Sequence, residues 1–252
     1  MIMSKTENRR SQEVQKPDGG FCLEIKGLQK LSVIDYPGKT CAVVFLGGCN
    51  FRCPFCQNPE LVLAPEKLPN MPQDEFFAFL QERKKWLDGV CITGGEPCIH
   101  QDLPEFIKKI KSMDFLVKLD TNGSNPGMLE QLLKEKLLDY IAMDIKAPLD
   151  RYDKAAGVKV DRGRILKSID LIRNSGVDYE LRSTILPKLH TDRDIIAIGE
   201  WLNGSKRFFM QQFRAEKTID PEFRKEKSFK PEELERFKEM LRTYFKEVGV
   251  RS

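Results

Sequence analysis

Short apolar runs alternate along this chain with longer stretches in which apolar residues recur every three or four positions. The clearest run, residues 40–46 (TCAVVFL), is apolar almost throughout, which is typical of a strand covered on both faces. We predict further strands at 89–93, 115–119, 140–143, 179–185 and 208–213, and a weaker one at 22–26. The pattern therefore predicts six strongly apolar strands and one weaker strand.

Helical periodicity fills the intervals between these runs. Apolar positions spaced as on one buried helix face occur at 103–110, 129–137 and 165–172, and again after Pro231. Gly176 follows the third of these stretches as a candidate C-terminal cap. Thr191, with Asp194 three residues later, resembles a capping box that begins another helix. Strand and helix thus alternate along most of the chain.

This alternation predicts parallel strands joined by right-handed crossovers. A complete barrel uses about 31 residues for each strand–helix unit, so the roughly 200 residues from Thr40 onward hold about six units. We expect an α/β fold, a partial and incompletely closed (β/α)6 TIM-like barrel, with an open doubly wound sheet as the alternative. Both folds place their chemistry at the carboxyl ends of the strands. Because no linker divides the chain, we expect a single domain at 21–252 after a disordered N-terminal tail at 1–20.

Charge and hydropathy limit the classes of partner. The sequence has 42 Lys and Arg against 38 Asp and Glu, a net charge of +4, which is too small an excess to indicate nucleic acid or an anionic membrane. No long apolar run or secretory signal is present, so we expect a cytoplasmic protein that does not enter a membrane.

Three of the seven cysteines lie within eight residues, as Cys49, Cys53 and Cys56. Their C-x3-C-x2-C spacing suits a compact centre of the soft metals that thiolates select. Three ligands are one fewer than a structural zinc site or an electron-transfer cluster normally has, which favours a catalytic centre with an open position. Cys98 is the one plausible fourth ligand, whereas we interpret Cys41 and Cys91 as small buried apolar residues within strands.

Polar residues gather where the predicted strands end. They are Thr93 to Pro97 after the second strong strand, Asp120 to Gly123 after the third and Asp144 to Lys146 after the fourth, with Arg182 in the fifth and Gln211 and Gln212 in the sixth. Since the carboxyl ends of parallel strands meet at one face, we expect these residues to surround a single site. His100 and His190, the only histidines, are interpreted as surface or capping residues.

These motifs together resemble those of a known family. CNFRCPFC at 49–56, followed by GGEP at 94–97, resembles the radical S-adenosylmethionine enzymes. More narrowly, the segment from DYPGKT through CQNPELVL, together with KLDTNGSNP, MDIKAP and QQFR, is similar to the activating proteins of anaerobic ribonucleoside-triphosphate reductase, which are glycyl-radical enzyme activases. The likeness spans about residues 22–245 and implies the partial barrel of the radical S-adenosylmethionine type.

The resemblance implies two cofactors. Cys49, Cys53 and Cys56 would hold a [4Fe–4S] cluster, and S-adenosylmethionine would bind its remaining iron through amino and carboxylate groups. An electron from the cluster would then cleave S-adenosylmethionine to methionine and a 5′-deoxyadenosyl radical that abstracts hydrogen from the target. Contacts to S-adenosylmethionine are expected from Phe55 and Gln57 beside the adenine, and from Gly94, Gly95 and Glu96 at the methionyl group.

The resemblance also implies a monovalent-cation site. Asp120, Thr121 and Asp144 match that site by position, and oxygen ligands suit a hard cation. Asn122 belongs to the same cofactor-binding segment, with turn or cap chemistry as the alternative role for it and for Asp120. Lys146 would contact the carboxylate of S-adenosylmethionine or the target backbone. Arg182, within an apolar strand, needs a partner, either a cofactor carboxylate or a core salt bridge.

We expect an enzyme that installs a glycyl radical on anaerobic ribonucleotide reductase and receives electrons from a donor such as flavodoxin or ferredoxin. One alternative keeps the cofactors but acts on another glycyl-radical enzyme or a small molecule, because a cofactor site does not encode its target. The other is a structural zinc module or a ferredoxin-like electron carrier. The cysteine count and the three additional motifs disfavour this last alternative.

Overall fold

A computed structural model describes residues 23–251 of the chain. Its strands form one eight-stranded sheet whose spatial order is the chain order, and every neighbouring pair from β2 to β8 is parallel. The strands are β1 (Ile25–Ser32), β2 (Cys41–Leu46), β3 (Gly89–Gly94), β4 (Leu116–Thr121), β5 (Tyr140–Asp144), β6 (Asp178–Ile185), β7 (Arg207–Gln212) and β8 (Glu247–Arg251). The predicted tail at 1–20 lies outside the described residues.

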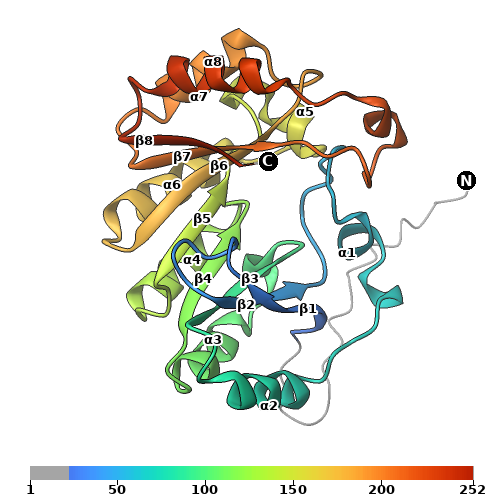
Figure 1. Cartoon of the computed structure of the whole chain (residues 1–252), viewed down its shortest axis with the longest axis vertical. Helices are drawn as coiled ribbons and strands as arrows, with labels where there is room; N and C mark the ends of the chain where they lie inside the picture. The colour runs from blue at the N-terminus through green and yellow to red at the C-terminus, as the bar shows by residue number, and fades with distance from the viewer. Residues whose placement is uncertain (1–22, 252) are drawn as a thin grey trace, which may run out of the picture.

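The sheet curves as a partial barrel with its helices on the outside (Figure 1). A doubly wound sheet reverses its strand order at a switch point, and this sheet does not, so the barrel prediction is confirmed and the alternative is wrong. The barrel is incompletely closed because β1 and β8 stand at opposite ends of the strand order. The six predicted strong strands correspond to β2–β7.

The two edge strands differ most from the sequence prediction. The weak run at 22–26 overlaps only the start of β1, which continues to Ser32 and pairs with β2 in the antiparallel direction. The last strand, β8, was not predicted and adds a seventh parallel strand after the final helix. Both edges carry partly exposed, charged residues, so neither has the apolar pattern of the central strands.

Five of the described helices follow the predicted periodicity, and three more, at 59–63, 73–83 and 152–156, were not predicted. The helices are α1 (Pro59–Leu63), α2 (Gln73–Arg83), α3 (Leu103–Lys111), α4 (Pro126–Lys134), α5 (Tyr152–Ala156), α6 (Arg162–Asn174), α7 (Asp192–Trp201) and α8 (Pro231–Leu241), with short 3-10 helices at η1 (Pro65–Lys67), η2 (Pro97–Ile99), η3 (Leu149–Arg151) and η4 (Pro221–Lys225). The capping box of Thr191 and Asp194 begins α7, as predicted. Gly176 has a φ of 77° just beyond α6, which is the left-handed conformation expected of a C-terminal cap. No described helix is long and apolar enough to cross a membrane.

Alternate residues of the central strands point into the barrel. The main apolar core lies between sheet and helices, whereas a second cluster, which includes Tyr36, Cys41, Cys91 and Tyr140, fills one part of the interior. Nearer the carboxyl ends, inward positions such as Asp120 and Arg182 are charged and line a cavity. The fold therefore gives the interior an apolar part and a polar part that opens at the strand ends.

Candidate active site

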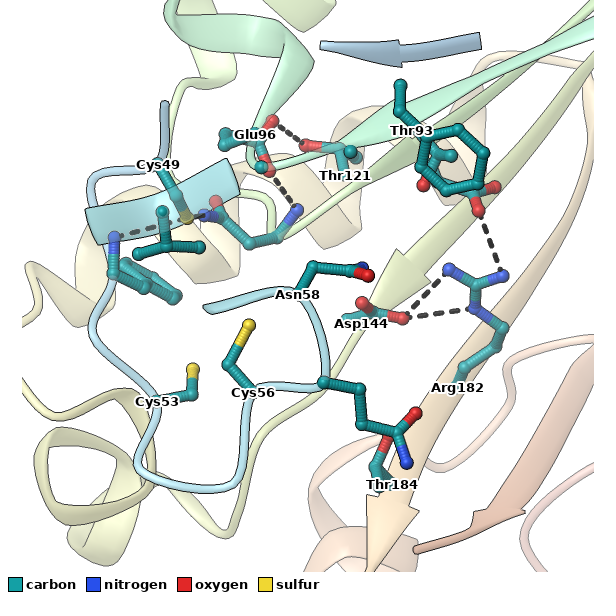
Figure 2. Close-up of a pocket in the computed structure, with 18 of the residues that line it drawn as sticks. Cys49, Cys53, Cys56, Asn58, Thr93, Glu96, Thr121, Asp144, Arg182 and Thr184 are labelled. Atoms are coloured by element: carbon teal, nitrogen blue, oxygen red, sulfur yellow. Dashed lines mark hydrogen bonds and ion pairs between the residues drawn. The ribbon is translucent and has the colours of Figure 1, made fainter. Parts of the chain in front are cut away.

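The cysteine loop connects β2 to α1 and faces a cavity of about 330 Å³. Cys49, Cys53 and Cys56 all line this cavity, and Figure 2 shows their sulfur atoms on the same side of it, opposite Asp144 and Arg182. The backbone N–H of Cys56 donates to the carbonyl of Cys53 at 3.0 Å, which closes the tight turn between them. The spacing predicted from sequence thus brings three thiols to one cavity.

The donor set fits an iron–sulfur cluster. Burial raises the pKa of Cys49 to about 11 and that of Cys53 to about 12, and it also raises the pKa of Cys56. The thiols are therefore protonated until a metal centre displaces their protons. Within residues 23–251 no three His, Cys, Asp or Glu side chains are grouped closely enough to hold a single metal ion. Three thiols that line one cavity suit a multi-iron centre that keeps one position open.

Gly94 and Gly95 allow the loop after β3 to pack against the start of the cysteine loop. Gly94 has a φ of 124°, and a Cβ there would lie 2.3 Å from the backbone nitrogen of Leu46. A Cβ on Gly95 would lie 1.7 Å from the carbonyl oxygen of Gly48. The backbone N–H of Glu96 donates to that same oxygen at 2.8 Å. Both glycines line the cavity, and the close approach that the structure shows is to neighbouring backbone, while their contact with the methionyl group stays a prediction.

Glu96 is held by three hydrogen-bond donors at the wall of the cavity. Its Oε1 accepts from the Thr121 hydroxyl at 2.7 Å (Figure 2) and from the backbone N–H of Cys98 at 3.0 Å, while its Oε2 accepts from the backbone N–H of Asn122 at 2.6 Å. The residue is 1% exposed, and burial raises its pKa although these donors lower it. The contact of Glu96 with the ammonium of S-adenosylmethionine stays a prediction.

Arg182 joins two carboxylates from neighbouring strands. Its guanidinium lies 3.2 Å from Asp120 and 3.0 Å from Asp144, so the core salt bridge that we weighed is present (Figure 2). Each carboxylate also pairs with a lysine, Asp120 with Lys118 and Asp144 with Lys146. Burial would raise the pKa of Asp144, but Arg182 and Lys146 lower it to about 2. In the same way burial opposes the ionisation of Asp120, while Arg182 and Lys118 hold its pKa below the usual value.

The predicted cation site therefore consists of groups that already have partners. Asp120 and Asp144 pair with basic side chains, and the Thr121 hydroxyl donates to Glu96. Asp120, Thr121 and Asp144 nevertheless line the same cavity, together with Asn122 and Lys146. The binding of a monovalent cation stays a prediction. A cation bound here would share the carboxylates of Asp120 and Asp144 with Arg182.

Phe55 and Gln57 occupy the far end of the cysteine loop. Both line the cavity, with Phe55 buried in the apolar core and the Gln57 amide donating to the carbonyl of Arg214 at 3.1 Å. That hydrogen bond ties the cysteine loop to the segment after β7. The expected contact of these residues with adenine stays a prediction.

The cavity also contains residues to which we gave no role. They are Asp35, Val43, Phe45, Phe51, Asn58, Val62 and Thr184, whereas Thr93 and Gln211 line the cavity as expected of strand-end residues. The period-two pattern of β2 and β6 could have identified Val43, Phe45 and Thr184, because they lie on the same face as residues nearer the strand ends. Asp35 belongs to the DYPGKT motif, and no strand-end rule would place it here.

Several other candidates lie away from the cavity. Cys98 is buried and does not line the cavity, so the structure does not bring this candidate fourth ligand to the three cysteines. Cys41 and Cys91 are fully buried in the inner apolar cluster, as predicted. His100 follows η2 and contacts the carbonyl of Gly47 at 2.9 Å, which agrees with a capping role.

His190 is buried, so a surface position is wrong for it. Its two ring nitrogens contact the backbone N–H of Leu186 at 3.3 Å and the carbonyl of Lys146 at 3.1 Å. Burial lowers the pKa of His190 to about 4. The neutral ring therefore joins the loop after β6 to the loop that carries Lys146.

Comparisons with known proteins agree with this site. Residues 43–202 match the model of the radical SAM superfamily, in which SAM is S-adenosylmethionine. A Methanocaldococcus jannaschii protein, described as a candidate glycyl-radical enzyme activating enzyme, is 35% identical over 90% of this chain and 95% of its own length. The pyruvate formate-lyase-activating enzyme of Clostridium pasteurianum is 30% identical over 68% of this chain and 72% of its own.

The fold has relatives among solved structures as well. Streptococcus suis SuiB, in a crystal structure with S-adenosylmethionine, superposes with a TM-score of 0.63 at 17% sequence identity. The superposition covers 81% of this chain and 48% of SuiB, so this chain corresponds to about half of that protein. Radical SAM enzymes use a [4Fe–4S] cluster and S-adenosylmethionine, which the three-thiol loop and the adjoining cavity fit. The chain belongs to the radical SAM superfamily and is a radical SAM enzyme of the glycyl-radical activating type.

Proposed function

We propose that this enzyme installs a glycyl radical on anaerobic ribonucleoside-triphosphate reductase. The observation that carries the proposal is the meeting of Cys49, Cys53 and Cys56 with the strand-end motifs in one cavity. With both cofactors bound, the cluster supplies an electron that cleaves S-adenosylmethionine and so provides the hydrogen-abstracting radical. The work of the protein is to hold, orient and shield the reacting groups.

Individual residues divide this work. The three cysteines would hold the cluster, with one position left for the amino and carboxylate groups of S-adenosylmethionine. Glu96, fixed by its three donors, presents a carboxyl group to the ammonium. Lys146 offers a positive charge to the carboxylate, because its ion pair with Asp144 raises its pKa against the opposing effect of burial. Phe55 and Gln57 border the space assigned to adenine.

The choice of target is supported by sequence motifs both within the cofactor site and outside it. DYPGKT, CQNPELVL, KLDTNGSNP, MDIKAP and QQFR together are similar to reductase activating proteins. The name of one relative refers to the activation of a glycyl-radical enzyme and that of another to the activation of pyruvate formate-lyase, and both support a protein target. An electron donor such as flavodoxin or ferredoxin completes the proposed system.

The proposal is tested by anaerobic incubation of the reconstituted enzyme with the reductase, S-adenosylmethionine and dithionite. We expect about four irons per chain and an EPR doublet from a glycyl radical on the reductase. Cys53→Ala is the matched control, because it removes one cluster ligand and should abolish both signals. Cleavage of S-adenosylmethionine without a doublet on the reductase would contradict the target and favour another glycyl-radical enzyme or a small molecule.

A further inference from the structure

The side-chain amide of Asn122 bridges the loop after β4 and the cysteine loop. Its Nδ2 lies 3.9 Å from the Sγ of Cys49 and donates to the Oδ1 of Asn50 at 3.0 Å. Its Oδ1 accepts from the backbone N–H of Ser124 at 2.9 Å. The residue is 5% exposed. The contacts with Asn50 and Ser124 fix the orientation of the amide. One of its N–H groups donates to Asn50, and the other is directed at the sulfur.

The surrounding contacts fix this orientation. The backbone N–H of Asn122 donates to Glu96, and the Asn50 amide donates to the Ser124 hydroxyl at 2.7 Å. In this way Asn122 contacts both a wall residue of the cavity and a cysteine that lines it. A rotation of the side chain would break the Asn50 and Ser124 contacts together.

The three cavity thiols differ in the donors that face them. Cys49 accepts from the backbone N–H of Phe51 at 3.4 Å as well as from Asn122, whereas Cys56 accepts from the backbone N–H of Asn58. Among the described residues, Asn122 is the one side chain that donates to any of these three sulfurs. Backbone donors accompany the loop whatever its sequence, but this donor depends on the residue at 122.

We propose that Asn122 is a positioning residue that donates an N–H···S hydrogen bond to the Cys49 thiolate and thereby raises the reduction potential of the cluster. The cluster accepts one electron on reduction, and the ligand sulfurs carry part of the added negative charge. A donor to such a sulfur stabilises the reduced form more than the oxidised form. Burial strengthens the effect, because water does not screen the amide dipole.

This inference rests on the cluster of the proposed function and on no particular target. If Asn122 serves only the turn after β4, the Oδ1 contact with Ser124 would be its whole role. Asn122→Asp separates the two roles, because it keeps an oxygen for the Ser124 N–H and replaces the donor with a negative carboxylate. Asn122→Ala removes both contacts. Ser124→Ala is the matched control, since it keeps the Ser124 N–H and the Asn122 amide and removes only the hydroxyl bonded to Asn50.

The first experiment measures the midpoint potential of the reconstituted cluster by mediated redox titration followed by EPR. Relative to the native enzyme, we expect a more negative potential in Asn122→Ala and a larger negative shift in Asn122→Asp. Ser124→Ala should keep the native potential. Native potentials in both Asn122 variants, at native iron content, would overturn the inference.

The second experiment keeps Asn122 in place, so that it decides the matter even if the Asn122 variants do not assemble a cluster. Asparagine labelled with 15N in its side chain is incorporated, and the reduced cluster is examined by pulsed EPR. We expect a hyperfine coupling to a side-chain 15N that Ser124→Ala retains. A reduced cluster without such coupling would overturn the role of Asn122, whereas failure of the native chain to assemble a cluster would contradict the proposed function itself.

Discussion

Arg182 offers the sharpest test of the charged interior. Replacing it with Gln removes the guanidinium that pairs with Asp120 and Asp144 and leaves two largely buried carboxylates close together. Breaking a buried ion pair from one side costs about 3–5 kcal/mol. Because Lys118 and Lys146 would still each neutralise one carboxylate, we expect the lower end, a loss of about 3 kcal/mol in the free energy of unfolding at pH 7.

The loss should depend on pH in a defined direction. In the native protein the pKa of Asp144 is lowered to about 2, and a lowered carboxyl pKa stabilises the fold above the unfolded pKa and ceases to do so as pH falls through the folded value. Without Arg182 this contribution to stability shrinks. The difference in the free energy of unfolding between native protein and variant should therefore be greatest above pH 5 and should narrow toward pH 3. Urea unfolding followed by circular dichroism measures it, with both proteins in the same cluster state. A loss below about 1 kcal/mol at pH 7, or one that is constant with pH, would refute the reasoning, and Arg182→Lys should lose less than Arg182→Gln.

Three further predictions concern other parts of the structure. His190 has a pKa of about 4 when folded, against about 6.5 when unfolded. Its contribution to the free energy of unfolding is therefore full above pH 6.5, and about 3 kcal/mol of it is lost as pH falls to 4. In urea unfolding His190→Gln should lose stability less steeply as pH falls, and an equal slope of stability against pH would count against this assignment. Gly95→Ala places a methyl 1.7 Å from a backbone oxygen and should lower the free energy of unfolding by about 3 kcal/mol. Gly127→Ala, whose methyl has its nearest contact at 3.6 Å, should be neutral or stabilising. Similar free energies of unfolding for the two variants, measured by heat or urea, would be inconsistent with the packing. Cluster assembly should release protons and proceed further at alkaline pH, because burial raises the pKa of Cys53 to about 12; iron uptake that is independent of pH would argue against buried, protonated thiols.

The central strands and the site face were predictable because two simple rules agree. Strands buried on both faces are nearly continuous in apolar residues, as in Cys41–Leu46, and parallel strands bring their carboxyl ends together. Reading only those ends placed Glu96, Asp120 and Asp144 at one site, and all three line the cavity. The cysteine spacing indicated the metal chemistry of the site without knowledge of the fold.

The partner of Arg182 could not be read from the sequence. Its salt bridges depend on lateral register, in which Asp144 stands directly opposite Arg182 while Asp120 reaches it from the next strand. Apolar periodicity shows which face a residue occupies, but not which residue lies beside it. The glycines after β3 illustrate the same limit, because a close approach to a ligand and one to neighbouring backbone require the same residue type.

The edge strands and His190 were missed for related reasons. β8 is short, partly exposed and carries Glu247 and Arg251 at its ends, so pairing with β7 determines it more than its own composition does. His190 stands between Leu189 and Thr191 in a loop with no periodic pattern, and its two backbone contacts form only in the folded chain. Both features arise from tertiary contacts that local patterns do not encode.

The central claim, hydrogen abstraction from a glycine of the reductase, can be followed with an isotope. The reductase is prepared with deuterium on its glycine α-carbons and incubated anaerobically with the reconstituted enzyme, S-adenosylmethionine and dithionite. The account predicts that the 5′-deoxyadenosine produced gains deuterium as the glycyl-radical doublet grows, and that the Cys53→Ala chain yields neither. Unlabelled 5′-deoxyadenosine, formed at the same rate with or without the reductase and with no doublet, would contradict it.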